Sequence, residues 1–202
     1  MKSTWARKQK LLTVASNLES GEPLWFGRER KKETLGRVFQ DELSARQRAG
    51  IEAACVDIWE PYRQSIEHWA PDCRIVYNKF QVMQHANRAV DEVRRAEFFR
   101  KGGRMRGLVT GKRWLLLTRC VNQTAGKRQQ LNELSTLNRR LLKAYLLKES
   151  LDHLWEHRYE GAMVRYFKSW MDQLRWQRLL PFQKLAEMLV DHFDGILNYC
   201  GT

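Results

Sequence analysis

Two short apolar runs in the first half of the chain are joined by a segment with helical spacing. Residues 53–56 are uniformly apolar and too few for a helix, so they predict a strand buried on both faces, and residues 75–77 predict a second strand. Between them, Pro61 suits the first turn of a helix, and apolar side chains follow it at helical intervals. A strand, a helix and a strand in this order imply parallel pairing and an α/β fold.

The residues before this unit predict a β-hairpin and a covering helix. Residues 11–15 and 24–26 are rich in strand-forming residues, and Gly21 lies between them at a position that suits a tight turn. Residues 32–42 carry apolar side chains spaced along one helical face, so we expect this helix to cover the sheet.

The pattern changes near residue 83, after which helical spacing replaces the strand-like runs. We therefore predict two regions, residues 1–83 as a partial α/β core and residues 84–202 as an all-helical region. Apolar stripes at helical spacing are expected to form the core of a helical bundle. They comprise Leu131, Leu134, Leu137, Leu141 and Tyr145; Ala162, Met163, Tyr166, Phe167, Trp170, Met171 and Leu174; and, after Pro181, Leu185, Met188, Leu189, Phe193, Ile196 and Leu197.

The composition favours a globular protein with a polyanionic partner. The 202 residues are 43% hydrophobic, which is sufficient for a core, and 36 Lys and Arg against 23 Asp and Glu give a formal net charge of +13. The apolar runs are too short for a membrane span, and no apolar leader is evident, so we expect a cytoplasmic protein without a membrane partner. The four cysteines have no C-x-x-C spacing, which argues against a zinc ribbon or a disulfide framework.

One segment of the helical region concentrates basic residues among glycines, and it is the best candidate for binding double-stranded DNA. Phosphate contacts there would supply affinity that is independent of sequence and sensitive to salt. A solvated loop is the alternative, because glycine and charge also describe ordinary loops. The candidate DNA-binding residues are Arg94, Arg95, Arg100, Lys101, Arg104, Arg106, Lys112 and Arg113.

Asp57 follows the first predicted parallel strand and is the candidate catalytic and metal-binding residue. Ligands of open α/β sheets bind at the carboxyl ends of the strands, where this side chain is expected to lie. The alternative is an Asp that turns or caps the chain after a strand, a position this residue favours.

Three longer phrases resemble bacterial insertion-sequence transposases of the ISL-three type. They are TVASNLESGEPLWFG at residues 13–27, ACVDIWEPYRQSIEHWAPDCRIVYNKFQ at residues 54–81 and QHANRAVDEVRRAEFFRKG at residues 84–102. The resemblance implies a ribonuclease-H-like core in which an Asp-Asp-Glu set holds two Mg²⁺ or Mn²⁺ ions for cleavage and transfer of DNA strands. It places Asp57 at the second acid of that set, at the end of the fourth strand. The helical region then corresponds to an all-helical insertion within the catalytic core.

Three departures from the family pattern predict that catalysis is lost. The first acid is expected upstream of Leu12, but residues 1–10 contain no acid, and the third acid is expected beyond Thr202. Where the family carries D-x-F-H, this chain reads Asn78-Lys79-Phe80-Gln81, which keeps hydrogen-bonding side chains but loses the charge and the imidazole. Two metals need several carboxylates, so Asp57 alone would not suffice. The sequence therefore predicts an incomplete ribonuclease-H-like sheet, truncated at both ends, with doubtful retention of the metals.

Three functions follow from these observations. The first is a DNA-binding transposase fragment without catalysis. The second is a DNA-binding or partner-binding protein that modulates a full-length transposase through mixed oligomers with it. The third is a protein–protein module built on the apolar face between Tyr166 and Leu174, without a metal.

Overall fold

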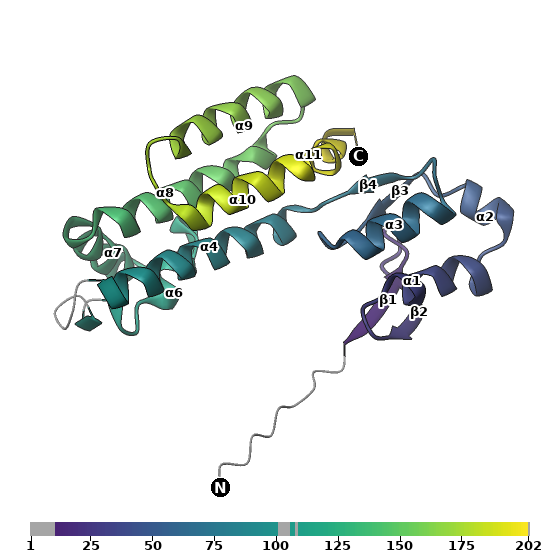
Figure 1. The fold of residues 1–202 in the computed structure, drawn as a ribbon, viewed down its shortest axis with the longest axis horizontal. Coiled ribbons are helices and arrows are strands. Elements are labelled where there is room, and N and C mark those ends of the chain that lie inside the picture. The colour runs from purple at the N-terminus through teal and green to yellow at the C-terminus, as the bar shows by residue number, and fades with distance from the viewer. Residues whose placement is uncertain (1–10, 101–105, 108, 202) are drawn as a thin grey trace, which may run out of the picture. The chain divides into compact units, whose positions relative to one another are not determined.

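The computed structural model describes residues 11–100, 106, 107 and 109–201, and it divides the chain into two compact units. We call Met1–Tyr77 the α/β unit and Asn78–Thr202 the helical unit (Figure 1). Each has its own elements, and α4, which begins the helical unit, starts at Lys79. The side chain of Asn78 accepts a hydrogen bond from the Gln81 backbone at 3.0 Å, which is the geometry of a helix N-cap. This explains why an Asn suits the position.

The hairpin predicted near the amino terminus is confirmed. Strand β1 (Leu12–Ser16) pairs antiparallel with β2 (Pro23–Arg28), and Gly21 in the connection has a φ of 73°, which glycine adopts without steric cost. One face of this hairpin, including Ala15 and Trp25, packs on the core of the α/β unit.

The parallel strand pair is also confirmed. Strand β3 (Ala53–Cys55) pairs parallel with β4 (Arg74–Val76), and α3 (Glu60–Trp69), with a proline in its first turn, connects them. The residues of β3 are half-buried, so the expectation of a strand buried on both faces is wrong. In the described residues the strands form two separate two-stranded sheets. The α/β class is therefore confirmed, whereas the ribonuclease-H-like topology stays a prediction.

Helices α1 (Lys32–Arg37) and α3 supply the core of the α/β unit. The predicted helix over residues 32–42 continues past α1 as a π-helical turn (Val38–Glu42), and the short α2 (Ala45–Ala49) follows. Their buried apolar residues form one cluster on which both sheets pack, since Ala15 of β1 and Ala54 of β3 contact it. The cluster comprises Leu35, Val38, Phe39, Tyr62, Ile66 and Ala70.

The helical unit is a bundle in which α4 packs against both α8 and α10, and α8 against α7 and α9 (Figure 1). Most of the predicted apolar stripes line its core, but Leu137 is 49% exposed, so its assignment to the core is wrong. Met163, Trp170 and Leu189 are fully buried. The face between Tyr166 and Leu174 is therefore internal and is not the free surface that the third hypothesis requires. The helices are α4 (Lys79–Arg100), α6 (Arg113–Leu117), α7 (Ala125–Leu137), α8 (Arg139–Asp152), α9 (Glu160–Leu174), α10 (Leu180–Asp191) and α11 (Phe193–Leu197), with 3-10 turns at Cys120–Asn122, His153–Glu156 and Asn198–Gly201.

A buried lysine fixes the end of α6 against α8. Lys148 donates hydrogen bonds to the carbonyl oxygens of Leu116, Leu117 and Thr118 at 3.1 to 3.3 Å, which satisfies backbone acceptors that a helix end leaves free. Burial lowers the pKa of Lys148, and the adjacent Glu149 carboxylate partly offsets this. In the described part of the chain, no helix is long and apolar enough to cross a membrane.

Candidate nucleic-acid interface

Three of the predicted DNA-binding arginines converge on one buried acid of α4. Arg94 and Arg95 donate hydrogen bonds from Nε to the two carboxylate oxygens of Asp91 at 2.8 and 3.0 Å. The Nε of Arg113, at the start of α6, lies 3.6 Å from the same carboxylate. The Arg94 side chain is 17% exposed, whereas those of Arg95 and Arg113 are 62% and 53% exposed. Asp91 thus holds two exposed guanidinium groups at fixed places on the surface.

The electrostatic balance at Asp91 favours the ion pairs. Burial alone would raise the pKa of this carboxyl, but the hydrogen bonds and charges of Arg94 and Arg95 outweigh burial and lower the pKa below its usual value. One carboxylate against three guanidinium groups leaves a local excess of two positive charges. The cluster is therefore suited to an anion such as a DNA phosphate.

A second buried acid, one turn and a half further along α4, repeats the arrangement. Glu97 accepts hydrogen bonds from Arg100 at 3.1 Å and from the amide of Asn138 at 3.0 Å, and Arg140 Nε lies 3.0 Å from its other oxygen. Asn138 also accepts hydrogen bonds from the backbone of Arg140 and Leu141, so it caps α8. This cap places Arg140 against Glu97.

Sequence analysis did not identify Arg140 or the anchoring acids. The intervals from Asp91 to Arg94 and Arg95, and from Glu97 to Arg100, are three and four residues, the spacing at which helical side chains meet. That signal could have found the local pairs. Arg140 comes from another helix, and only the packing of α8 on α4 brings it to Glu97.

The other predicted DNA-binding residues have separate surroundings. The guanidinium of Arg106 lies 5.5 Å from the ring centre of Phe98, and Lys112 donates a hydrogen bond to Gln130 at 3.0 Å. Lys101 and Arg104 lie outside the described residues. The structure therefore brings Arg94, Arg95 and Arg113 together at Asp91 and Arg100 and Arg140 together at Glu97.

Asp57 lies just beyond the carboxyl end of β3, as predicted. The Val56 backbone still donates to Val76 at 3.1 Å, and Asp57 follows at once. Its carboxylate faces Arg30 Nη2 at 3.1 Å, and the Arg30 guanidinium lies over the ring of Trp59, with 4.8 Å between them. Glu29, with a φ of 74°, turns the chain immediately before Arg30. The candidate catalytic acid is thus half of an ion pair.

The surroundings of Asp57 do not fit a two-metal site. Two divalent ions need several oxygen ligands, and a guanidinium in contact with the carboxylate opposes a cation there. Across residues 11–100, 106, 107 and 109–201, no group of three or more His, Cys, Asp or Glu side chains could hold a metal. The described residues do not by themselves supply the Asp-Asp-Glu ligand set.

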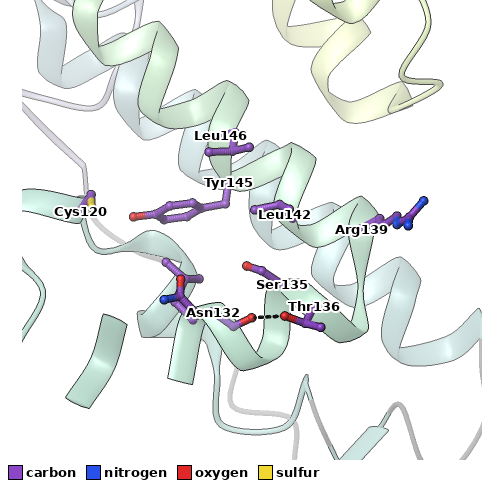
Figure 2. A pocket seen from close by; sticks show the side chains of 9 residues that line it. Cys120, Asn132, Ser135, Thr136, Arg139, Leu142, Tyr145 and Leu146 are labelled. Atoms are coloured by element: carbon purple, nitrogen blue, oxygen red, sulfur yellow. Dashed lines mark hydrogen bonds between the residues drawn. The ribbon is translucent and has the colours of Figure 1, made fainter. Parts of the chain in front are cut away.

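A pocket of about 640 Å³ lies between α7 and α8 (Figure 2). The ring of Tyr145 points across it toward Cys120, and burial, with the charge of Glu149, raises the pKa of the Tyr145 hydroxyl. Its lining contains no Asp or Glu side chain among the described residues. The lining residues are Cys120, Leu131, Asn132, Ser135, Thr136, Arg139, Leu142, Tyr145 and Leu146.

Residues 3–202 match the ISL3 family of DDE transposases, so the chain belongs to this transposase family. It is 28% identical over 180 residues to the transposase of insertion sequence element IS1001 of Bordetella parapertussis, covering 88% of this chain and 44% of that protein. It is 26% identical over 222 aligned positions to the IS1557 transposase of Mycobacterium tuberculosis, covering 97% of this chain and 50% of that protein. The chain thus spans about half the length of these relatives. No solved structure matches it.

Proposed function

We propose that this chain is a DNA-binding part of a DDE transposase and that it does not cleave DNA by itself. The observation that carries the proposal is the convergence of Arg94, Arg95 and Arg113 on buried Asp91. An arginine held by a buried carboxylate loses less conformational freedom when it binds a phosphate, because its position is already fixed. The anchored guanidinium groups are therefore better placed for DNA than solvated ones.

The distribution of charge supports the same assignment. The helical unit contains 23 of the 36 basic and 12 of the 23 acidic residues, a formal net charge of +11. The α/β unit contains the other 13 and 11, a net charge of +2. Long-range attraction of a polyanion would thus act mainly on the helical unit.

The expectation that the chain does not cleave DNA rests on the surroundings of Asp57. Its carboxylate is paired with Arg30, and the described residues provide no further set of acids for two metals. In this proposal Asp57 is a family ligand position that the present chain uses for an ion pair. Mg²⁺ or Mn²⁺ would require acids from outside the described residues.

Binding of the full chain to labelled duplex DNA at several salt concentrations tests the DNA assignment. We expect the logarithm of affinity to fall linearly with that of the salt concentration. Arg95→Ala and Arg113→Ala should each weaken binding and reduce the slope by roughly one. Lys168→Ala, which removes the same charge from an exposed site on α9, is the matched control and should change both less. Affinity without salt dependence, or equal effects of Lys168→Ala, would contradict the proposal.

A cleavage assay tests the second half of the proposal. The chain is incubated with supercoiled DNA that carries the ends of its own element, with Mg²⁺ or with Mn²⁺, and nicking is measured beside Asp57→Ala. We expect no nicking from either protein. Nicking by the natural chain that disappears in Asp57→Ala would show that the acid is catalytic, and the proposal would be wrong.

A partner-binding function is the second candidate, and the outward face of the hairpin favours it. Leu12 and Val14 of β1 and Leu24 and Phe26 of β2 are 50 to 61% exposed. Because side chains alternate across a strand, these four lie on the face opposite Ala15 and Trp25. Exposed apolar faces of this kind mark sites that another polypeptide covers. The partner we propose is a longer transposase chain of the same family, since the relatives extend well beyond the matched region.

Co-purification with a tagged longer transposase tests this candidate. Leu24→Ser and Phe26→Ser together should abolish retention of the present chain, because they remove apolar area from the middle of the face. Val190→Ser, at an equally exposed position on α10, should leave retention unchanged. Retention that survives the hairpin substitutions would eliminate this surface as the contact.

A further inference from the structure

Exposed aromatic side chains lie beside the anchored arginines of the helical unit. Trp176 is 83% exposed, Phe99 70% and Trp114 69%. Single exposed apolar residues are common on protein surfaces and need no explanation. Two of the three have an arginine guanidinium over the ring, Arg113 at Trp114 and Arg175 at Trp176. Arg113 belongs to the cluster on Asp91, and Phe99 directly precedes Arg100 of the cluster on Glu97.

Trp114 is built into the Asp91 cluster. The guanidinium of Arg113, which faces Asp91, lies 5.3 Å from the ring centre of Trp114, close enough for a cation–π contact. Phe99 immediately precedes Arg100, which is paired with Glu97. Each acid of α4 therefore fixes an arginine that has an exposed aromatic neighbour.

Trp176 lies in the turn between α9 and α10. Backbone hydrogen bonds from Arg175 to Asp172 and from Gln177 to Leu174 close this turn. At the end of the turn, Arg178 has a φ of 48°, a left-handed backbone conformation that residues other than glycine rarely adopt. The turn thus presents Trp176 to solvent in a defined position, with the guanidinium of Arg175 5.9 Å from its ring centre.

Arg140 connects this turn to the Glu97 cluster. Its Nη2 donates a hydrogen bond to the Arg178 carbonyl at 3.4 Å, while its Nε faces Glu97 at 3.0 Å. The connection between α9 and α10 consequently lies at the end of the helical unit where α8 begins (Figure 1). Arginines from α4, α8 and the turn, together with Trp176, occupy the same end of the bundle.

Positive charge interleaved with exposed aromatic rings is the surface that unpaired nucleic-acid strands require. The guanidinium groups bind phosphates, and the rings stack on bases whose faces are free. In a regular duplex the base faces are covered by their neighbours, so a protein that binds only duplex phosphates gains nothing from exposed tryptophans. Tyr159, 79% exposed at the start of α9, has no arginine over its ring among the contacts of the described residues and serves as a comparison.

We propose that the helical unit binds DNA whose bases are locally unpaired, with Trp176 and Trp114 stacking on exposed bases and the anchored arginines holding the flanking phosphates. This inference rests on the proposed DNA-binding function and narrows its substrate class. It assigns DNA contacts to Trp176, Trp114 and Arg140, which are not among the DNA-binding residues predicted from the sequence.

Fluorescence anisotropy with the full chain and two DNAs tests the inference. One DNA is a fully paired duplex, and the other has the same length with a central run of mismatched bases. We expect tighter binding to the mismatched DNA, by roughly 5- to 100-fold at equal salt, as base stacking on an aromatic ring predicts. Trp176→Ala and Trp114→Ala should each remove much of this preference. Trp176→Ala should also leave duplex affinity within about twofold, since it removes no charge and Trp176 lies outside the Asp91 cluster. Trp176→Phe should retain most of the preference.

Tyr159→Ala is the control for loss of an exposed ring, and circular dichroism verifies that each variant remains folded. Equal affinity for the two DNAs, or equal weakening of both by Trp176→Ala, would overturn the inference while leaving duplex binding intact. Failure to bind either DNA would overturn both this inference and the proposed function. Conversion of an oligomer to a monomer by Trp176→Ala, without a change in DNA preference, would assign the turn to a protein interface and also overturn it.

Discussion

Asp57 in the α/β unit and Asp91 in the helical unit both face arginine side chains, but their burial and the number of their partners differ. The Asp57 side chain is 39% exposed and has one arginine, Arg30. Asp91 is 8% exposed and has three, Arg94, Arg95 and Arg113. The first pair is close to neutral, whereas the second cluster retains an excess of positive charge.

The difference shows how an acid can increase the usefulness of a basic surface. Counting charges alone, Asp91 and Glu97 subtract from the attraction of a helical unit with a net charge of +11. In the structure they lie beneath the arginines and limit the conformations of the guanidinium groups. We infer that the acids of the helical unit position charge, whereas Asp57 in the α/β unit is neutralised by its partner Arg30.

The largest expected effects test whether the two units are energetically separate. Ile66 is 2% exposed in the core of the α/β unit, and Leu151 is fully buried in the helical unit. Replacing either by Ala should lower the free energy of unfolding by about 2–5 kcal/mol, since each leaves a cavity. Because the cores are distinct, we expect each substitution to shift a different calorimetric transition. A single transition that both substitutions lower equally would contradict this separation.

The next effect compares the acids directly. Glu97 is 1% exposed, and Glu97→Ala would leave Arg100 and Arg140 without their buried partner, at a cost of about 2–4 kcal/mol in the free energy of unfolding. Asp57→Asn should change stability by less than about 1 kcal/mol, because both members of that ion pair are partly exposed. Urea unfolding monitored by circular dichroism measures both. Similar losses would mean that the proposed contrast between the acids is wrong.

Local patterns in the sequence were sufficient for the elements but not for the acid clusters. The hairpin, the parallel pair around α3 and the buried face of α9 follow from periodicity and from the positions of Gly21 and Pro61. The half-burial of β3 could not be predicted, because exposure depends on which elements cover a strand rather than on its own apolar run.

The candidate site also contains residues that local sequence patterns could not predict. A run of basic residues predicted an interface, and Arg94, Arg95 and Arg113 do gather in one place. The contribution of Arg140 depends on a tertiary contact with Glu97. Likewise, Asp57 was found from its place after a strand, but its partner Arg30 reaches it from the segment between β2 and α1.

The pH dependence of stability should distinguish Asp91 from an ordinary surface acid. Its pKa is lowered in the folded state, so its contribution is fully present above the usual carboxyl value of about 4 and is lost as the pH falls through the lowered pKa. We expect Asp91→Asn to destabilise the protein by about 1–3 kcal/mol at neutral pH. The difference between the two proteins, from urea titrations at a series of pH values, should shrink below about pH 4. A constant difference across that range would show that the ion pairs are not its source.

The smallest effect is the most direct test of how the acids act on DNA binding. Asp91→Asn raises the net charge by one, so if the acid merely opposes DNA, the variant should bind duplex DNA more tightly. If Asp91 instead fixes Arg95 and Arg113, the variant should bind duplex DNA more weakly, by roughly two- to fivefold. Without the carboxylate, the two arginine side chains are mobile in the free protein and lose conformational entropy when they bind DNA. Glu187→Gln on α10 adds the same charge away from both clusters and should strengthen binding slightly. Anisotropy titrations measure the duplex affinity of the natural chain and both variants at one salt concentration. Affinity changes of opposite sign for Asp91→Asn and Glu187→Gln are expected only if Asp91 holds the arginines in place.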